Sequence, residues 1–476
     1  MIFTEFRFFL FFAVVFGVYW TLRPNSWRKA WILLCSYAFY GAWDWRFLSL
    51  IIGSTLVDYV VGLNLGKEGK TPKARRGWLL LSLGVNLGAL AFFKYANFFA
   101  DSAVGLFGWL GLPMNSVTLN VVLPVGISFY TFQTLSYSLD IYAGRLQPRK
   151  SLLDLATFVA FFPQLVAGPI VRASDFLPQL ESARQFSQIN VRACLTLFLV
   201  GFFKKACVSD NLAPIVDRYF AEPSAFDAVS GWIGVLSYTT QIYCDFSGYS
   251  DMAIACAGLL GYELCVNFNF PYFASSITDF WRRWHISLST WLKDYLYIPL
   301  GGNRGGQWFT YRNLMLTMVL GGLWHGAAWT FVVWGALHGG ALIINREWSK
   351  FAKAIPSLAR PSVWLSMLMS MLNVALTFYW VCIAWVFFRA DSFGTALSVL
   401  RSFVLMRSPG TQQLNLGLFG VFFVLACLHW LTSKEVWTHA VDNMPTQLYA
   451  VGYGFAAALL LTLVPVGYTP FIYFQF

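Results

Sequence analysis

Apolar runs long enough to cross a lipid bilayer recur along the whole chain, and they limit its fold more than any other feature. A spanning helix needs about 20 mostly apolar residues. The chain has 476 residues, of which 58% are hydrophobic and only 12% are charged, about half the charged share of soluble domains. The sequence therefore predicts an all-α polytopic membrane protein, with residues 1–476 forming a single integral membrane domain.

The apolar runs predict a bundle of about 11–12 transmembrane helices, with shorter re-entrant or interfacial helices between them. Outside the stretch 279–338, the predicted spans are residues 5–22, 30–43, 47–65, 78–100, 120–143, 191–207, 229–245, 247–265, 364–388, 415–432 and 447–467. The last two of the central runs, 229–245 and 247–265, meet in the sequence YCDFSGYSDMA.

The positive charge is better explained by membrane topology than by a nucleic-acid partner. The net charge is +11, but the Lys and Arg residues are scattered over short loops, of which residues 67–76 are the most basic. Because cytoplasmic loops collect Lys and Arg, this loop and the basic turn after the first span predict a periplasmic N-terminus. The connection 101–119 has no Lys or Arg, and the same count of spans predicts that it lies on the periplasmic side. We expect no nucleic-acid partner.

Metal and phosphate sites are not indicated. The eight cysteines form no CxxC pair and no Cys/His cluster with metal-ligand spacing, so the sequence predicts neither disulfides nor a metal. The glycine-rich loop 301–306 matches no phosphate-binding pattern.

Residues 152–172 contain a helix-breaking sequence, FFPQLVAGPIVR, with Pro163, Gly168 and Pro169 close together. Broken backbone at membrane depth survives only where protein or a water-filled cavity satisfies its polar groups. The segment is either re-entrant or a kinked span, and the sequence leaves both open.

The stretch 279–338 divides into a charged part and an apolar part. In the first part, Thr278 is a predicted N-cap of a helix that begins at Asp279. At helical spacing, Trp281, Trp284 and His285 share an aromatic face, so this helix should lie at the membrane interface with His285 turned inward. The stretch holds three of the chain's five histidines, His285, His325 and His338.

His325 is predicted to lie in the middle of an apolar span, among Gly321, Gly322 and Gly326. The glycines let another backbone or a ligand approach the imidazole closely. Burial disfavours the charged imidazolium, and a neutral imidazole suits a general base that activates a hydroxyl. The physical argument alone still favours a hydrogen-bonded bundle residue for His325 and an aromatic-belt residue for His285.

Other polar groups in apolar runs are interpreted as structural. His338 is expected to be structural, and His429 and His439 carry no motif. The acidic and hydroxyl residues of YCDFSGYSDMA suit a catalytic acid or nucleophile, but more often such residues are satisfied bundle polars or helix caps; they are Asp245, Ser247 and Asp251.

Four segments resemble the membrane-bound O-acyltransferase (MBOAT) family, nearest to its bacterial alginate O-acetyltransferase branch. They are FFPQLVAGPIVR (161–172), YCDFSGYSDMAIA (243–255), NFNFPYFASSITDFWRRWHISLSTWLKDYLYIPLGGNR (267–304) and LGGLWHGAAWTFVVWGALHG (320–339). The endings WVFFRA (385–390) and PFIYFQF (470–476) are similar to that branch as well. The resemblance covers most of the chain.

The resemblance implies a helical bundle around a tunnel through the bacterial inner membrane. His325 would be catalytic, and His285 would be a second histidine facing the same chamber. The implied reaction moves an acyl group, expected to be acetyl from acetyl-CoA or another cytoplasmic thioester, to an exopolysaccharide such as alginate. No bound cofactor is implied, while membrane lipid and periplasmic acetyltransferase proteins are the expected partners. Alternatives are D-alanyl transfer to teichoic acid, a transporter or flippase without covalent chemistry, and a structural scaffold of a secretion complex.

Overall fold

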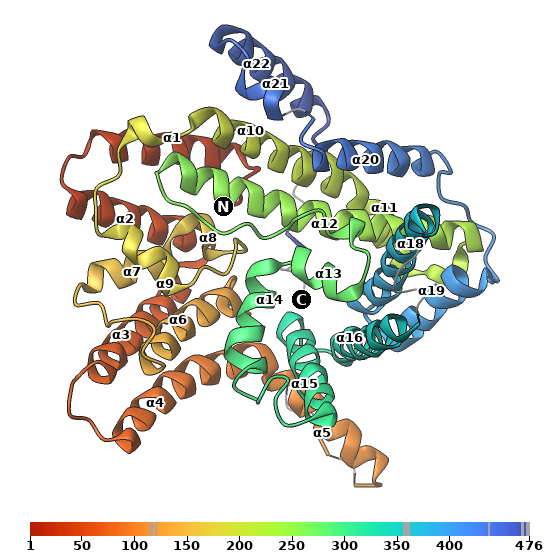
Figure 1. Ribbon diagram of the computed structural model, residues 1–476, viewed down its shortest axis with the longest axis horizontal. Helices are drawn as coiled ribbons and strands as arrows, with labels where there is room; N and C mark the ends of the chain where they lie inside the picture. The colour runs from red at the N-terminus through yellow and green to blue at the C-terminus, as the bar shows by residue number, and fades with distance from the viewer. Residues whose placement is uncertain are drawn as a thin grey trace. The chain divides into compact units, whose positions relative to one another are not determined.

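The computed structural model describes residues 1–112, 114–115, 118–119, 121–355, 362–436, 438–467 and 471–472. The chain forms two compact units (Figure 1). Unit 1 comprises Met1–Phe198 and Tyr249–Cys265, and unit 2 comprises Leu199–Gly248 and Val266–Phe476. Within the described residues every regular element is a helix, and the one β-bridge joins Phe226 to Gln412.

The described residues of unit 1 form nine α-helices before Val191. They are α1 (Phe6–Thr21), α2 (Asn25–Asp44), α3 (Leu48–Leu65), α4 (Pro72–Leu90), α5 (Ala96–Trp109), α6 (Ile127–Tyr142), α7 (Leu152–Ala160), α8 (Phe162–Leu165) and α9 (Ala173–Phe176). The prediction that 101–119 is a connection is wrong at its start, because α5 continues to Trp109 and a glycine with φ of 77°, Gly111, follows its end.

A buried polar network joins α3, α4 and α6 in unit 1. The Asp58 carboxylate is fully buried and accepts hydrogen bonds from the hydroxyls of Ser82 and Ser138 and from the amide of Asn86. Because an unmade hydrogen bond is costly where water is absent, the network fixes the mutual positions of these three helices.

The segment 152–172 is broken rather than kinked. Helix α7 ends at Ala160, and α8 is a single turn that begins at Phe162. Side chains satisfy the freed backbone: Ser36 accepts from the Phe162 N–H at 3.1 Å, and the Gln164 amide donates to the Phe158 carbonyl at 2.8 Å. These contacts supply the protein partners that a broken helix requires.

Two further helices contain two of the three points where the chain passes between the units; the third lies between Cys265 and Val266. They are α10 (Val191–Phe202) and α12 (Ala228–Leu259). The prediction of separate runs at 229–245 and 247–265 is wrong, since α12 continues without a break from the first run into the second and ends at Leu259. The stretch has no proline, and Gly248 allows close packing: a Cβ there would lie 2.6 Å from the Gly201 carbonyl oxygen.

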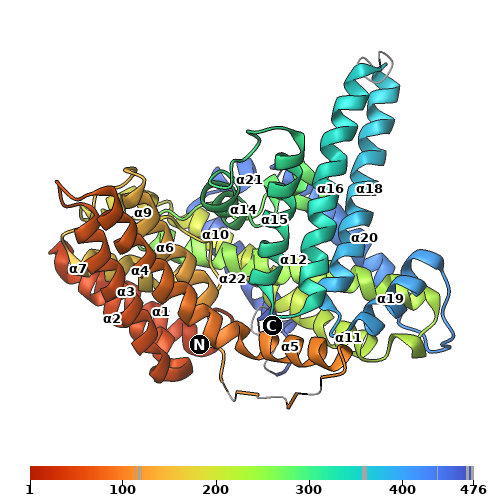
Figure 2. The same ribbon diagram turned by 90° about the horizontal axis from the view of Figure 1, so that it is seen from below.

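The remaining helices belong to unit 2. They are α11 (Asp210–Ala221), α13 (Ile277–Arg283), α14 (Ile286–Leu292), α15 (Gln307–His325), α16 (Trp329–Ala354), α18 (Val363–Arg389), α19 (Phe393–Leu405), α20 (Leu418–Ser433), α21 (Thr438–Asp442) and α22 (Thr446–Thr462). The long helices α16 and α18 run side by side (Figure 2).

Glycines bring α15 and α16 into backbone contact. A Cβ on Gly322 would lie 2.2 Å from the Phe331 carbonyl oxygen, and one on Gly335 would lie 2.3 Å from the Met318 carbonyl oxygen. The prediction that glycines near His325 admit a second backbone is therefore confirmed, and that backbone belongs to α16.

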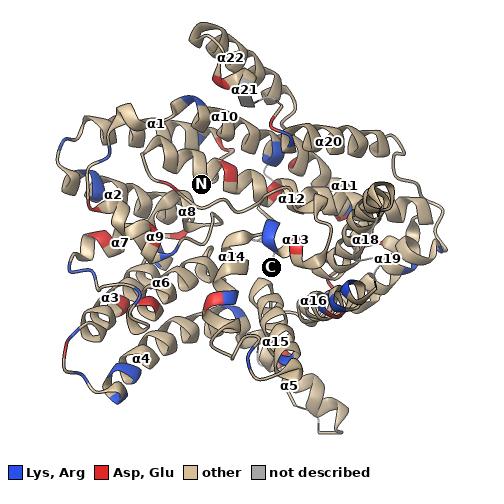
Figure 3. Ribbon diagram, in the orientation of Figure 1, with Lys and Arg blue, Asp and Glu red and all other residues tan. Residues whose placement is uncertain are grey.

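The helices carry few charged residues, and Lys and Arg gather at the turn between α3 and α4 and in the first turn of α4 (Figure 3). By length and composition, three helical stretches in the described part of the chain are able to cross a bilayer: Asn25–Leu65, Pro72–Trp109 and Val363–Arg389. Four shorter apolar helices accompany them. The all-α membrane class is confirmed, while the expected number of spans and the single-domain organisation stay predictions.

Candidate functional site

His285 lies between two seven-residue helices, α13 and α14, rather than on one continuous helix. The predicted N-cap is also wrong: α13 begins at Ile277, and the Ser276 hydroxyl caps it by accepting from the Asp279 N–H at 3.1 Å. Thr278 lies inside the helix, where its hydroxyl accepts a hydrogen bond from Asn345. The inward orientation is as expected, since His285 is fully buried.

The break occurs because His285 adopts the left-handed conformation, with φ of 42° and ψ of 54°. Such a conformation is strained for a residue other than glycine and persists only where neighbours fix it. Asn267 supplies contacts that fix this conformation. Its carbonyl oxygen accepts from the Ile286 N–H at 2.9 Å, and its side-chain oxygen lies 3.1 Å from His285 Nδ1.

Asn267 was not among the predicted site residues. It stands at the start of the segment 267–304 that carries the family resemblance, but nothing local in the sequence marks it as a partner of a histidine 18 residues later. Only the fold brings the two together.

His325 is the last residue of α15, not the middle of a span. Gly326 is extended, with φ of −155°, and α16 starts only at Trp329. The histidine is nevertheless 3% exposed, so the predicted burial is correct. Because α15 ends inside the protein, the His325 imidazole lies at the turn that leads from α15 into α16.

The structure brings His285 and His325 together. Their ring centroids lie 6.3 Å apart, with the planes inclined at 58°. Aromatic rings line the pair: Phe246 is 4.6 Å from His285, and Trp334 and Phe388 are 5.1 Å and 5.2 Å from His325. An apolar wall of this kind excludes water and strengthens electrostatic interactions inside.

Burial lowers the pKa of His285 to about 3, from an ordinary value of 6.5. The histidine lies outside the spanning helices, because neither α13 nor α14 is long enough to cross a bilayer. Desolvation disfavours the imidazolium, so this imidazole is neutral at neutral pH. A neutral imidazole can accept a proton or a hydrogen bond from a hydroxyl.

His338 lies apart from this pair in a box of aromatic rings. It is fully buried and accepts a hydrogen bond from the Trp281 indole at 3.3 Å, while Phe280 stacks on it at 5.9 Å. This environment agrees with the structural role expected for it. His429 contacts Tyr243 at 5.2 Å, and the His439 side chain lies outside the described residues.

Asp245 belongs to a buried ion-pair cluster. The Lys205 ammonium lies 2.5 Å from Asp245 and 2.6 Å from Asp210, and each of the three side chains is at most 10% exposed. The Ile472 N–H donates to the second Asp245 oxygen at 2.8 Å. Asp245 is therefore a satisfied bundle residue, as the structural interpretation predicts.

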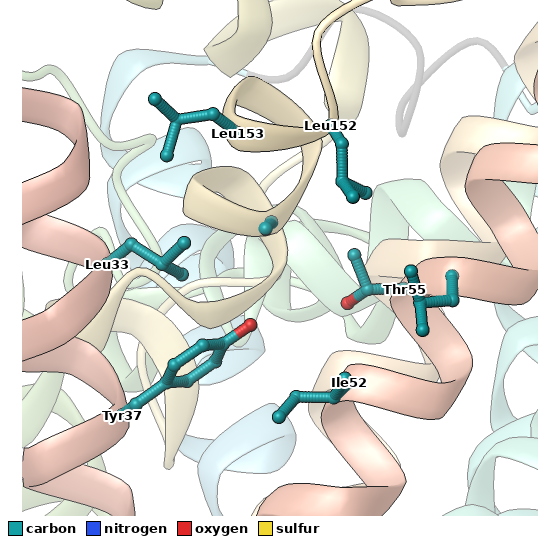
Figure 4. Close-up of a pocket in the computed structure, with 8 residues that line it drawn as sticks. Leu33, Tyr37, Ile52, Thr55, Leu152 and Leu153 are labelled. Atoms are coloured by element: carbon teal, nitrogen blue, oxygen red, sulfur yellow. The ribbon is translucent and has the colours of Figure 1, made fainter. Parts of the chain in front are cut away.

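A cavity of about 320 Å³ lies elsewhere, in unit 1, between α2, α3 and α7 (Figure 4). Its lining is almost wholly apolar, and its polar side chains are the hydroxyl groups of Tyr37 and Thr55. It offers no paired acid and base, so it does not resemble a site for acyl transfer.

The arrangement of the two histidines suits proton transfer from a hydroxyl, because the buried imidazoles lie close together among aromatic rings. The two buried imidazoles come from different elements. The backbone is strained at His285, and a close contact between α15 and α16 supports His325. In the part of the chain that the structure describes, no group of three His, Cys, Asp or Glu residues has the geometry to hold a metal ion.

Known proteins resemble this chain over most of its length. The family model described as "MBOAT, membrane-bound O-acyltransferase family" matches residues 143–364. A protein from Azotobacter vinelandii named "Probable alginate O-acetylase" is 45% identical over 86% of this chain and 78% of its own length. A protein of the same name from Pseudomonas putida is 41% identical over 98% of both chains.

A relative with another acceptor in its name is almost as similar. The "Peptidoglycan O-acetyltransferase" of Helicobacter pylori is 40% identical over 79% of this chain and 73% of its own length. The matched residues 143–364 include both His285 and His325. With 41–45% identity extending over most of the sequence, this chain belongs to the membrane-bound O-acyltransferase family and is an integral-membrane O-acyltransferase.

Proposed function

We propose that this O-acyltransferase transfers acetyl from a cytoplasmic thioester, acetyl-CoA, for the O-acetylation of an exopolysaccharide such as alginate. The observation that carries the proposal is the buried pair of His285 and His325, 6.3 Å apart within the family-matched region. The names of the relatives support acetyl as the transferred group and a polysaccharide as the final acceptor.

In the proposed reaction, His325 is the general base, and His285 orients the acceptor or stabilises the oxyanion. His325 takes the proton of the acceptor hydroxyl, whose oxygen attacks the thioester carbonyl carbon and forms the new C–O bond. The C–S bond then breaks, and the leaving thiolate receives the proton from His325 as CoA leaves. General-base catalysis of this kind contributes about 10²–10⁴ to the rate.

The proposed setting is the bacterial inner membrane with a periplasmic N-terminus. The basic loop 67–76 supports this orientation, because positive loops stay in the cytoplasm. Donor would then arrive from the cytoplasm and acceptor from the periplasm, where acetyltransferase proteins are the proposed direct partners. We propose acetyl-CoA as a substrate and not as a resident cofactor.

The test is release of CoA by the purified full chain in lipid nanodiscs with labelled acetyl-CoA, with and without a hydroxyl acceptor. The wild type should turn over, and His325→Ala should lose about 10²–10⁴ in rate at equal protein level. His429→Gln is the matched control, a histidine of the same unit outside the pair, and it should retain activity. Near-normal turnover in His325→Ala would contradict the assignment.

Two other functions give different outcomes in the same assay. A transporter or flippase would bind a substrate without releasing CoA. Because it has no acetylation chemistry to lose, substitution of either histidine would leave the result of the assay unchanged. A D-alanyl transferase would fail with acetyl-CoA and accept a D-alanyl thioester instead.

A further inference from the structure

We infer that Asn267 is a positioning residue for the reaction: it fixes His285 in the tautomer that has its proton on Nδ1 and its lone pair on Nε2. The inference rests on the proposed function for its kinetic consequences only, because the tautomer follows from the hydrogen bonds themselves. In this tautomer, Nε2 of His285 can accept a hydrogen bond from the hydroxyl of the acyl acceptor. The neutral ring cannot donate a hydrogen bond from Nε2 to an oxyanion.

The first step is the identity of the Asn267 side-chain atom that faces His285. Oxygen and nitrogen of an amide are assigned from their partners. The same atom lies 3.3 Å from the backbone nitrogen of Ser287, and a backbone N–H can only donate. The atom is therefore the amide oxygen, and it also accepts from the Ser287 hydroxyl at 2.8 Å.

The second step is the proton on His285. An amide oxygen only accepts hydrogen bonds, so the His285 nitrogen 3.1 Å away must carry a proton. That nitrogen is Nδ1. Because the buried imidazole is neutral, Nε2 carries the lone pair. This is the arrangement in which a neighbouring acceptor orients a histidine and sets which of its nitrogens can act as a base.

The third step is the backbone. Asn267 also accepts from the Ile286 N–H through its own carbonyl, at 2.9 Å, so it holds three consecutive residues, 285, 286 and 287. A second backbone bond, from the Asn269 N–H to the Arg283 carbonyl at 2.9 Å, fixes the chain before the break. The left-handed conformation of His285 is thus over-determined, as strained backbone at a functional site must be.

Asn267 is the amide that contacts Nδ1 of His285, and uncharged groups surround much of the ring. His325, from α15, is the titratable side chain that faces it, at 6.3 Å. Uncharged groups from four segments also pack against the ring: Phe246 from α12, Phe268 from the loop before α13, Trp324 from α15 and Ser287 from α14.

The decisive variants are Asn267→Ala and Asn267→Asp in the full chain, with Asn211→Ala, an asparagine of the same unit that bonds the Cys207 and Leu463 carbonyls, as the matched control. Asn267→Ala removes the acceptor, and kcat for CoA release should fall about 10²-fold, the effect of a misplaced catalytic group, with KM changed far less. Asn211→Ala also removes an asparagine side chain and its hydrogen bonds but leaves the Asn267–His285 contact, so its kcat should stay near wild type.

Asn267→Asp keeps an acceptor in place and adds a negative charge, which favours the protonated imidazole. Its kcat should approach wild type at alkaline pH, and the acid limb of its pH profile should move to higher pH. A purely structural asparagine would give no such movement. The inference is overturned if the acid limb does not move, or if Asn267→Ala folds and keeps its kcat.

A second measurement does not need catalysis. The unfolding temperature of the wild type should fall between pH 7.5 and 5.5, because unfolding releases a histidine that then takes up a proton. Asn267→Asp should reduce this fall, since His285 would already be protonated in the folded state; the other histidines are common to both proteins. If the wild type releases no CoA, the proposed function fails, while an equal fall in both proteins overturns this inference.

Discussion

The imidazole rings of His285 and His325 lie 6.3 Å apart, although one sits at a break between two short helices and the other ends α15. Their proximity depends on two separate supports. Asn267 holds the first ring, and the glycine contact between α15 and α16 holds the second. Each support can be removed without touching either histidine.

Substitutions at the two histidines should not be additive. We expect His325→Ala and His285→Ala each to lower kcat for CoA release, the first by about 10²–10⁴. The double variant should be little worse than His325→Ala alone, because groups that act as a unit are lost together. The rates of the wild type, the two single variants and the double variant, measured at matched protein level, give the coupling free energy between the two histidines.

Independent effects whose logarithms simply add would show that the rings act separately. The controls for folding are the unfolding temperature and the yield of each variant in membranes, which should match the wild type.

Acid should destabilise the folded protein through His285. Burial lowers the pKa of this imidazole to about 3, so the folded state stays neutral while the unfolded histidine takes up a proton below its ordinary value of 6.5. The unfolded state then binds more protons between these two pH values. Stability is unaffected above pH 6.5 and falls as the pH drops below it, by at most about 1.4 kcal/mol per pH unit.

Comparison of the wild type with His285→Gln measures this effect. The glutamine does not titrate, so its unfolding temperature should fall less between pH 7 and 5. Identical acid sensitivity in the two proteins would mean that His285 is protonated in the folded state. The other four histidines are the same in both proteins and cancel.

Much of the fold follows from the sequence, because apolar runs and breaker residues are local signals. Runs such as 364–388 lie where α18 forms, and the Pro163–Pro169 sequence marks a genuine break. The break at His285 has no such signal. Helical periodicity predicts one helix through residues 279–295, and the tertiary contacts of Asn267 override it.

The same contrast holds for the candidate site. The glycines around His325 announce a close approach, but the sequence does not say that a helix ends there or that α16 provides the contact. The pairing of His285 with His325 comes from folding two segments 40 residues apart onto each other, and no local pattern contains it.

A methyl group at Gly322 should shift His325, because Gly322 lies in the contact between α15 and α16 that supports the end of α15. Its Cβ would lie 2.2 Å from the Phe331 carbonyl oxygen, so α15 and α16 must separate. Gly322→Ala should cost about 1–3 kcal/mol of stability through overpacking and lower kcat by shifting the end of α15. Gly340→Ala is the control, because nothing lies within 4 Å of its added Cβ.

Thermal unfolding and CoA release of both variants check this expectation. Equal behaviour of Gly322→Ala and Gly340→Ala would show that the close helix contact is not needed for the site.

The buried cluster of Lys205, Asp210 and Asp245 should matter more for stability than any surface ion pair. Removing one partner of a buried pair leaves an uncompensated charge and typically costs about 3–5 kcal/mol. Asp245→Ala should cost less than this, about 1–3 kcal/mol, because Lys205 keeps Asp210 as its partner while the buried Ile472 N–H loses its acceptor.

The matched control is Asp217→Ala, which breaks a pair with Arg389 that is 56% exposed on the aspartate side. Exposed pairs contribute about 0–1 kcal/mol, so this variant should unfold close to wild type. Asp245→Asn separates charge from hydrogen bonding: it keeps an oxygen that can accept from Ile472 but loses the charge beside Lys205. We expect its stability to fall between wild type and Asp245→Ala, and equal losses in the two Asp245 variants would assign the effect to charge alone.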